Sequence, residues 1–170
     1  MAIAVATLMP GAAACAAHYD LGQRVDHATI APWDIDISPD GAGLPPGSGT
    51  VAQGRQLFAT RCAMCHGDAG QGGIGDALVG GAGTLSSAKP KKTVGSYWPY
   101  ATTLFDYIRR AMPYNAPQSL SADEVYAVSA YLLYLNKVVP EDTRLDAKTL
   151  PGVCMPNRDG FVPDPRPGAL

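Results

Sequence analysis

The sequence predicts an all-α domain organised around one short motif, on the strength of three observations. Residues 50–61, 96–111 and 121–138 each repeat apolar side chains every three or four residues, which is the period of an α-helix. The motif Cys62-Ala63-Met64-Cys65-His66 directly follows the first of these segments, and no strand pattern leads into it. The chain contains 19 glycines and 15 prolines, yet 46% of it is apolar. We therefore expect a helical domain with long ordered loops rather than disorder.

The first predicted helix spans residues 50–61 and leads into the motif. Thr50 is a suitable N-cap, because its hydroxyl can accept a hydrogen bond from a free N–H group of the first turn. One face of the helix recurs at steps of three and four residues and consists of Val51, Gly54, Leu57, Phe58 and Cys62. Glycine inside a helix costs stability, so Gly54 indicates that another element approaches this face closely.

The five-residue motif predicts a covalently attached haem c. Two thiols at this spacing, Cys62 and Cys65, can form thioether bonds with the two vinyl groups on one edge of a porphyrin. The imidazole of His66 then falls beneath the ring. One of its nitrogens can bind the iron, and the other can donate a hydrogen bond that sets the orientation of the imidazole. We predict Cys62 and Cys65 as the thioether residues and His66 as an axial iron ligand.

Three other uses of a Cys-x-x-Cys pair compete with haem attachment. A thioredoxin-type redox pair needs a βαβ context, which the flanking residues do not provide. Half of a zinc site needs a second pair of ligands, but Cys15 and Cys154 are isolated in the chain. A structural disulfide across two intervening residues is strained and easily reduced. The flanking sequence favours haem.

A glycine-rich loop follows the motif. Residues 67–83 contain eight glycines but lack the Gly-Lys-Ser/Thr of a phosphate-binding loop. Glycine lets a backbone pass close to another group because it has no Cβ. We expect this loop to run close to a flat haem face.

The second predicted helix lies within residues 96–111. Pro99 suits its first turn. The helix is expected to end at Met112-Pro113, because the residue before a proline is disfavoured in the helical conformation.

The last predicted helix, residues 121–138, has the clearest boundaries. Ser121-Ala-Asp-Glu124 is a capping box. Lys137 is expected in the last turn, where a cation complements the helix dipole, and Pro140 follows the end.

An electron carrier usually gives its haem iron a second protein ligand. The candidates are Met64, Met112, Met155, His18 and His27. Met64 lies inside the attachment motif and cannot reach the opposite face of the ring, whereas Met112 lies in a turn that leaves its side chain free to aim inward. We predict Met112 as the second axial ligand, with Met155 or a histidine as alternatives. Methionine ligation raises the reduction potential, and a filled sixth position excludes oxygen, peroxide and substrate.

Residues 1–17 are apolar, small and uncharged. They predict the core of a secretory signal with Ala14-Cys15-Ala16 as its cleavage site, and therefore a periplasmic protein. A buried N-terminal helix is the alternative, and a lipid anchor on Cys15 is a weaker one. The stretch is too short and alanine-rich to predict a transmembrane anchor.

The remaining segments flank the helical domain, which we assign to residues 50–140. Residues 18–49 form an extended arm around Trp33 that either wraps the domain or docks a partner. Residues 141–170 form a proline-rich C-terminal tail with Cys154 as a thiol without an obvious partner. The net charge is −2 at pH 7, and no basic block indicates nucleic-acid binding.

Residues 50–140 resemble class I cytochrome c. The resemblance rests on Gly54 and Phe58 of the first helix, the Cys62-x-x-Cys65-His66 motif, the Met112-Pro113 turn and Tyr131 of the last helix. It implies three to five helices around one covalently bound haem. It also implies that the first and last helices cross closely, which would explain Gly54.

The flanking segments resemble a narrower group. Residues 33–51, 112–121 and 155–161 are similar to the cytochrome subunits of Sox sulfane dehydrogenases and of related molybdenum sulfite dehydrogenases. This resemblance implies that a molybdenum subunit oxidises sulfite or sulfane sulfur and that this chain accepts the electrons one at a time. A downstream cytochrome or oxidase would receive them.

We therefore expect an electron-transfer subunit that is not catalytic by itself. A freely diffusing periplasmic carrier is the first alternative, although a carrier needs only a small, transient contact surface and no long arms. A haem enzyme or sensor with an open sixth position is the second alternative, and Met112 argues against it.

Overall fold

The computed structural model describes residues 21–163 and 165–166. The predicted secretory signal with Cys15, and the candidate ligand His18, lie outside the described residues. The chain divides into two units, with the boundary between Asp34 and Ile35. The first unit contains the short helix α1 (His27–Ile30), and the second contains the predicted helical domain. No helix in the described part of the chain combines the length and hydropathy needed to cross a membrane.

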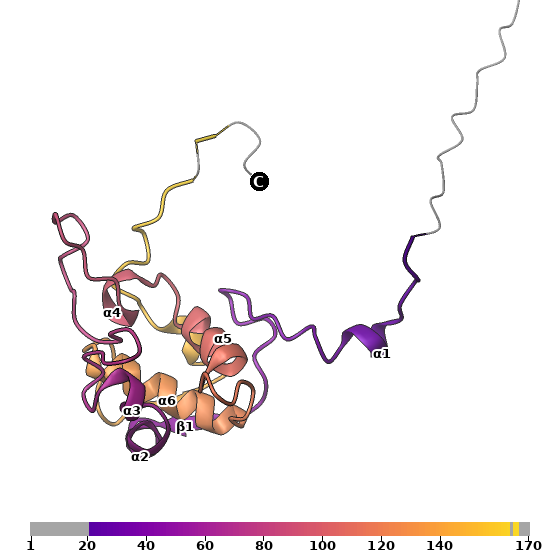
Figure 1. Cartoon of the computed structure of the whole chain (residues 1–170), viewed down its shortest axis with the longest axis horizontal. Helices are drawn as coiled ribbons and strands as arrows, with labels where there is room; N and C mark the ends of the chain where they lie inside the picture. Colours follow the sequence, from indigo (N-terminus) through magenta and orange to yellow (C-terminus); the bar gives the residue numbers. More distant parts are fainter. Residues whose placement is uncertain (1–20, 164, 167–170) are drawn as a thin grey trace, which may run out of the picture. The chain divides into compact units, whose positions relative to one another are not determined.

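The second unit is mainly helical (Figure 1). Its elements in chain order are β1 (Ser48–Thr50), α2 (Val51–Arg61), α3 (Ala63–His66), α4 (Val94–Tyr97), α5 (Ala101–Ala111), α6 (Ala122–Leu135), β2 (Arg144–Asp146) and a short 3₁₀ helix, η1 (Leu150–Gly152). Helices α2 and α6 confirm the first and last predicted helices. Both begin with a complete capping box, one at Thr50 and one at Ser121.

The segment 96–111 is not one helix, so the prediction for Pro99 is wrong. Helix α4 ends at Tyr97 and α5 begins at Ala101. Trp98, which precedes the proline, is extended with φ −72° and ψ 130°. The proline ring excludes its predecessor from the helical region, and this constraint separates the two helices.

The prediction that Lys137 lies in the last turn of the last helix is also wrong. Helix α6 ends at Leu135, and Lys137 adopts a positive φ of 60°. The N–H of Lys137 donates to the Tyr134 carbonyl at 2.8 Å, and the N–H of Val138 donates to the Leu133 carbonyl at 2.9 Å. These two bonds form a Schellman motif, which closes the helix earlier than its apolar periodicity suggests.

Helix α6 forms the centre of the core. Its residues from Val125 to Leu133 are all buried. Helix α2 crosses it at Gly54, where an added Cβ would lie 1.9 Å from the Ala127 carbonyl oxygen. Helix α5 also packs on α6, with the rings of Phe105 and Tyr126 4.4 Å apart between centroids. The close crossing predicted from Gly54 is confirmed.

The C-terminal segment contributes to the core as well as forming a tail. Strand β2 pairs antiparallel with β1, with Leu145 opposite Gly49. Leu145, Leu150 and Met155 are buried in the main core. Strands of three residues carry too little alternation to be visible in a sequence, which explains why this sheet was not predicted.

Residues 35–47 lie along the domain. The carbonyl of Pro39 accepts a hydrogen bond from Thr102, and the carbonyl of Pro45 accepts one from the hydroxyl of Tyr126 at 2.9 Å. Burial raises the pKa of Tyr126 to about 12, so this hydroxyl keeps its proton at neutral pH. The C-terminal part of the predicted arm is therefore hydrogen-bonded to the domain.

Candidate functional site: the haem-attachment turn

The predicted attachment residues lie on one helical turn. The N–H groups of Cys65 and His66 both donate to the carbonyl of Cys62, at 3.1 and 3.0 Å. Residues three and four positions apart share one face of a helix. The two thiols and the imidazole therefore emerge from the same side of α3, whereas Met64 is 84% exposed.

Both thiols of this turn are free and half-buried. Burial raises the pKa of Cys62 to about 11. At neutral pH this sulfur is a thiol rather than a thiolate, which makes it a poor nucleophile and disulfide partner. Cys62 is therefore not an activated, low-pKa cysteine of the thioredoxin type.

The orientation of His66 is set by a backbone carbonyl. Its Nδ1 lies 2.7 Å from the carbonyl oxygen of Asp76. A carbonyl can only accept a hydrogen bond, so Nδ1 carries the proton and donates it. The lone pair is then on Nε2, which is the nitrogen left to bind a metal. This is the hydrogen bond that the motif predicts for the second imidazole nitrogen.

The glycine-rich loop closes around this histidine. The N–H of Gly75 donates to the Cys65 carbonyl at 2.8 Å, and the N–H of Gly72 donates to the His66 carbonyl at 2.8 Å. An added Cβ on Gly75 would lie 2.9 Å from Cε1 of His66. The backbone thus needs a glycine at this position to reach the imidazole. The loop therefore approaches the His66 ring closely, whereas its expected approach to a haem face stays a prediction.

Asn136 ties the far end of this loop to the end of α6. Its Nδ2 donates to the carbonyls of Leu78 and Leu132, at 3.0 and 2.9 Å. The loop carbonyl at Gly80 also accepts a hydrogen bond from Thr93. Sequence reasoning missed Asn136, because its partner Leu78 is 58 positions away and a lone asparagine after a helix gives no signal of such a contact.

Met112 lies at the end of α5, as predicted. Its N–H donates to the Ile108 carbonyl at 3.0 Å, and its backbone then becomes extended with φ −120° and ψ 145°. Its half-buried side chain packs against the core cluster that Cys62 also contacts. Met155 is buried in that cluster, whereas His27 is exposed and lies in the first unit.

The last turn of α5 is held by a charged network that sequence reasoning did not predict. Nε of Arg110 donates to both carboxylate oxygens of Asp106, at 2.9 and 3.0 Å. Nη2 of Arg110 donates to Asp36 at 2.6 Å. Arg110 is two residues before Met112, so this network links residues 35–47 to the helix end that carries the methionine.

These residues fit a haem c. Two free thiols and an imidazole with an available Nε2 share one turn, and a methionine lies against the same core. Thioether-forming cysteines, a proximal histidine and a methionine are the donor set of cytochromes c. The predicted residues therefore match the group in type, and the Asp76 hydrogen bond leaves Nε2 of His66 available to a metal.

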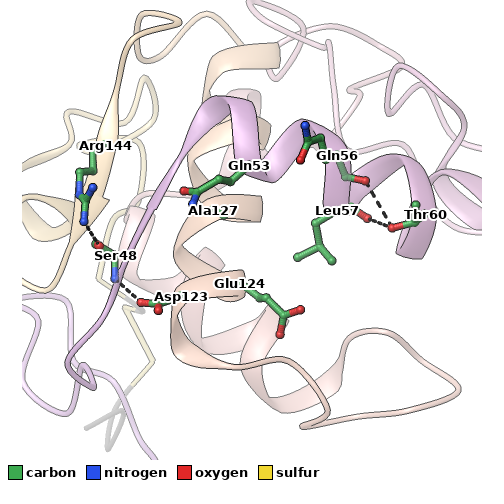
Figure 2. A pocket seen from close by; sticks show the side chains of 9 residues that line it. All are labelled: Ser48, Gln53, Gln56, Leu57, Thr60, Asp123, Glu124, Ala127 and Arg144. Atoms are coloured by element: carbon green, nitrogen blue, oxygen red, sulfur yellow. Dashed lines mark hydrogen bonds between the residues drawn. The ribbon is translucent and has the colours of Figure 1, made fainter.

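A polar groove of about 530 Å³ lies between β1, α2, β2 and the start of α6 (Figure 2). Within it the N–H of Ser48 donates to Asp123 at 2.6 Å, and Arg144 donates to the Ser48 hydroxyl. Its lining contains neither an attachment residue nor Met112. The first of these hydrogen bonds joins β1 to α6, and the second joins β2 to β1.

The family model named Cytochrome c matches residues 51–136, which is half of the chain. The chain belongs to the cytochrome c family. Members carry a covalently bound haem c, and Cys62 and Cys65 have the spacing of its attachment motif. The predicted fold class and cofactor are confirmed, and the domain is that of a one-electron carrier.

One solved structure is similar to this chain well beyond the residues that the family model matches. The chain matches a chain of the sulfane dehydrogenase SoxCD from Paracoccus pantotrophus with 46% identity and a TM-score of 0.81, covering 88% of this chain and 74% of that one. This match confirms the predicted resemblance to the cytochromes of sulfur oxidation.

Two curated relatives are thiosulfate dehydrogenases. The one from Stutzerimonas stutzeri is 32% identical over 103 residues, and the one from Psychrobacter arcticus is 26% identical over 114 residues. The matches cover 59% and 61% of this chain but 32% of each relative. The chain thus spans about a third of the length of these relatives.

Proposed function

We propose that this chain is the electron-accepting cytochrome subunit of a periplasmic, molybdenum-dependent sulfite or sulfane dehydrogenase. The supporting observation is the 46% identity to a chain of sulfane dehydrogenase SoxCD over 88% of this chain. The family model covers only residues 51–136. The similarity to the dehydrogenase therefore includes segments that a cytochrome domain does not need.

Cys62, Cys65 and His66 of the attachment turn would hold the haem and supply one of the two protein ligands of its iron. Haem c, when bound, supplies one iron that gains or loses one electron at a time. Cys62 and Cys65 would hold it covalently. His66 would bind the iron through Nε2, while its Nδ1–H donates a hydrogen bond to the Asp76 carbonyl, with 2.7 Å between the nitrogen and the oxygen. This hydrogen bond keeps the imidazole in one tautomer and one orientation.

Met112 would supply the second axial ligand. Its backbone N–H is held by the Ile108 carbonyl, and its side chain packs against the same core cluster as Cys62. A thioether favours ferrous iron and raises the reduction potential. Under this proposal the oxidation of the sulfur compound belongs to the molybdenum subunit. This chain passes electrons singly to a downstream cytochrome or oxidase and catalyses nothing alone.

Co-purification tests the proposal. A tagged copy of the chain is isolated from its native periplasm, and the accompanying proteins are identified by mass spectrometry. We expect a molybdenum-cofactor subunit in near-equal amount, and we expect haem reduction when sulfite or a sulfane donor is added to the isolated complex. A cytochrome of the same periplasm, tagged in the same way, serves as the control. Recovery of this chain alone, without reduction by either substrate, would instead favour a freely diffusing carrier.

A further inference from the structure

We propose that residues 21–34 are a docking arm for the dehydrogenase subunit, and that Ile30 and Trp33 are its anchors in an apolar groove of that subunit. The inference rests on the proposed function and specifies how the two subunits are held together. Four observations support it, namely exposure, local order, attachment to the domain and the extent of the similarity to the dehydrogenase.

The arm exposes an unusual amount of apolar surface. Leu21 is 88% exposed, Val25 55%, Ile30 42% and Trp33 82%. Single exposed apolar side chains are common on proteins, but several within one short segment mark an interaction site. Tryptophan is among the residues most enriched in the energetic centres of interfaces.

Local hydrogen bonds order the part of the arm that carries the anchors. The Asp26 carboxylate accepts from the N–H of Thr29 at 2.8 Å and caps α1. Hydrogen bonds from Thr29 lower the pKa of Asp26, so the cap stays charged at neutral pH. After α1, the N–H groups of Trp33 and Asp34 both donate to the Ile30 carbonyl, at 2.8 and 3.1 Å. Ile30 and Trp33 are therefore presented on an ordered turn.

Val25 and Ile30 have the spacing of a hydrophobic staple. Val25 directly precedes the capping residue Asp26, and Ile30 is the fourth residue of α1. A pair at these positions fixes the direction in which a chain enters a helix. Binding then costs less conformational entropy than it would for a fully extended tail, because part of that entropy has already been lost in the free protein.

The arm continues directly into a segment that is fixed to the domain. Asp36 is ion-paired with Arg110, and the Pro39 carbonyl accepts from Thr102. An arm anchored at its base raises the local concentration of the domain around the partner. The contact through which electrons pass can then remain small and weak without loss of the complex.

The extent of the similarity to SoxCD favours the dehydrogenase subunit as the partner that binds the arm. The match to the SoxCD chain covers 88% of 170 residues, about 150 residues, and therefore extends into the chain before residue 35. The cytochrome c family model begins at residue 51. The arm is thus shared with a dehydrogenase chain and is not part of what defines a cytochrome.

The charge of the arm argues against a lipid surface as the occupant. Arg24 is accompanied by Asp26 and Asp34, and the arm contains no lysine. Peripheral helices that bind anionic lipid carry clusters of lysine and arginine beside their apolar residues. A protein groove needs no such cluster, because apolar burial and backbone hydrogen bonds supply the affinity.

The test uses the haem-loaded cytochrome and the purified molybdenum subunit that co-purifies with it. Isothermal titration calorimetry compares the wild type with the variant Ile30→Ala/Trp33→Ala and with Gln23→Ala, an exposed polar change in the same arm. We expect the double variant to bind roughly 30-fold more weakly or worse, as when an interface loses a hot-spot residue, and Gln23→Ala to bind within about twofold. Haem spectra and reduction potentials should be the same in all three proteins.

Steady-state reduction of the cytochrome by the molybdenum subunit adds a second measurement. The double variant should raise KM for the cytochrome and leave kcat unchanged, because the arm holds the complex and takes no part in electron transfer. A lower kcat with unchanged KM would overturn the docking role.

The remaining outcomes separate this inference from the proposed function. If the wild type binds the molybdenum subunit and the double variant binds equally well, the arm is not the docking element and the proposed function stands. If the wild type does not bind, both fail. Binding of the wild type to vesicles of phosphatidylcholine and phosphatidylglycerol, or a dimer seen by analytical ultracentrifugation, would overturn the assignment if the double variant abolished it.

Discussion

The two proposed iron ligands are held by different kinds of structure. His66 is held by its own neighbourhood: its ring by the Asp76 carbonyl at 2.7 Å, and its backbone by Gly72 at 2.8 Å. Met112 is held by a helix end, and that end is tied through Arg110 to Asp36, 74 positions earlier in the chain. The direct contacts of His66 are therefore local, with one distant tie at Asn136 behind its loop, whereas the helix end that carries Met112 is restrained by a distant ion pair.

This difference indicates which side of the site is easier to disturb. The loop that follows the motif is closed by backbone hydrogen bonds from Gly72 and Gly75 to His66 and Cys65. This part of the loop is therefore held to the motif without help from helix packing. A ligand on a helix end follows any displacement of that helix, and the Asp36 carboxylate of the ion pair that restrains it is 84% exposed. We therefore expect the methionine side to open first under stress, and the following variants test this expectation.

Met112→Ala should have the largest effect. Loss of a thioether ligand opens the sixth position and lowers the reduction potential by on the order of 100 mV or more, since axial ligation sets haem potentials over about 0.8 V. Absorbance spectroscopy should show loss of the methionine–iron charge-transfer band, and redox titration should show the lower potential.

Met64→Ala is the matched control for that variant, because Met64 is 84% exposed. An unchanged band in Met112→Ala, with loss of the band in Met155→Ala, would move the ligand assignment to Met155.

Gly75→Ala should disturb the histidine side. The new Cβ would lie 2.9 Å from Cε1 and 3.0 Å from Nδ1 of His66. Either the loop or the ring must move, at a cost of about 1–3 kcal/mol in unfolding free energy, as for other overpacked sites. Guanidinium titration followed by haem absorbance measures this loss. Gly152→Ala, where nothing lies within 4 Å, should change little, and a neutral Gly75→Ala would contradict the close approach.

Asn136→Ala should have a smaller effect on the same side. It removes the hydrogen bonds to the Leu78 and Leu132 carbonyls, which costs about 1–2 kcal/mol of unfolding free energy. The His66 Nδ1 proton should also exchange faster by NMR, because the loop that carries Asp76 is less restrained. Asn115→Ala, an exposed change, is the control. An unchanged exchange rate in Asn136→Ala would show that the loop holds the imidazole without Asn136.

Asp36→Asn should have the smallest effect. Its ion pair with Arg110 is partly exposed on one side and mostly exposed on the other, and such pairs contribute about 0.2–1 kcal/mol. The difference from the wild type should shrink at 1 M salt, where exposed charges are screened. Thermal unfolding at low and high salt measures it, with Asp142→Asn as an exposed control. A loss that does not depend on salt would mean that Asp36 acts by packing.

Much of the helical framework could be predicted because its signals are local. Thr50 and Ser121 mark the starts of their helices, because each side chain accepts a hydrogen bond from the backbone N–H three residues later. Both predicted N-termini have a complete capping box. The apolar pattern was misleading in two places. Pro99 separates α4 from α5, and a Schellman motif ends α6 before Lys137, although the apolar pattern continues through both segments. Gly54 is the exception among distant contacts, since a glycine inside a helix signals a close neighbour even when that neighbour is unknown.

The sequence by itself determined the haem c chemistry, because the attachment motif places two thiols and an imidazole on one turn through hydrogen bonds that reach only a few residues. Only the tertiary structure decided what surrounds that turn. The clamp of Asn136 on Leu78 and the ion pair of Arg110 with Asp36 join residues 58 and 74 positions apart. Such contacts depend on how helices pack and have no period in the sequence. They set the position of the loop that holds the His66 ring and of the helix end that carries Met112.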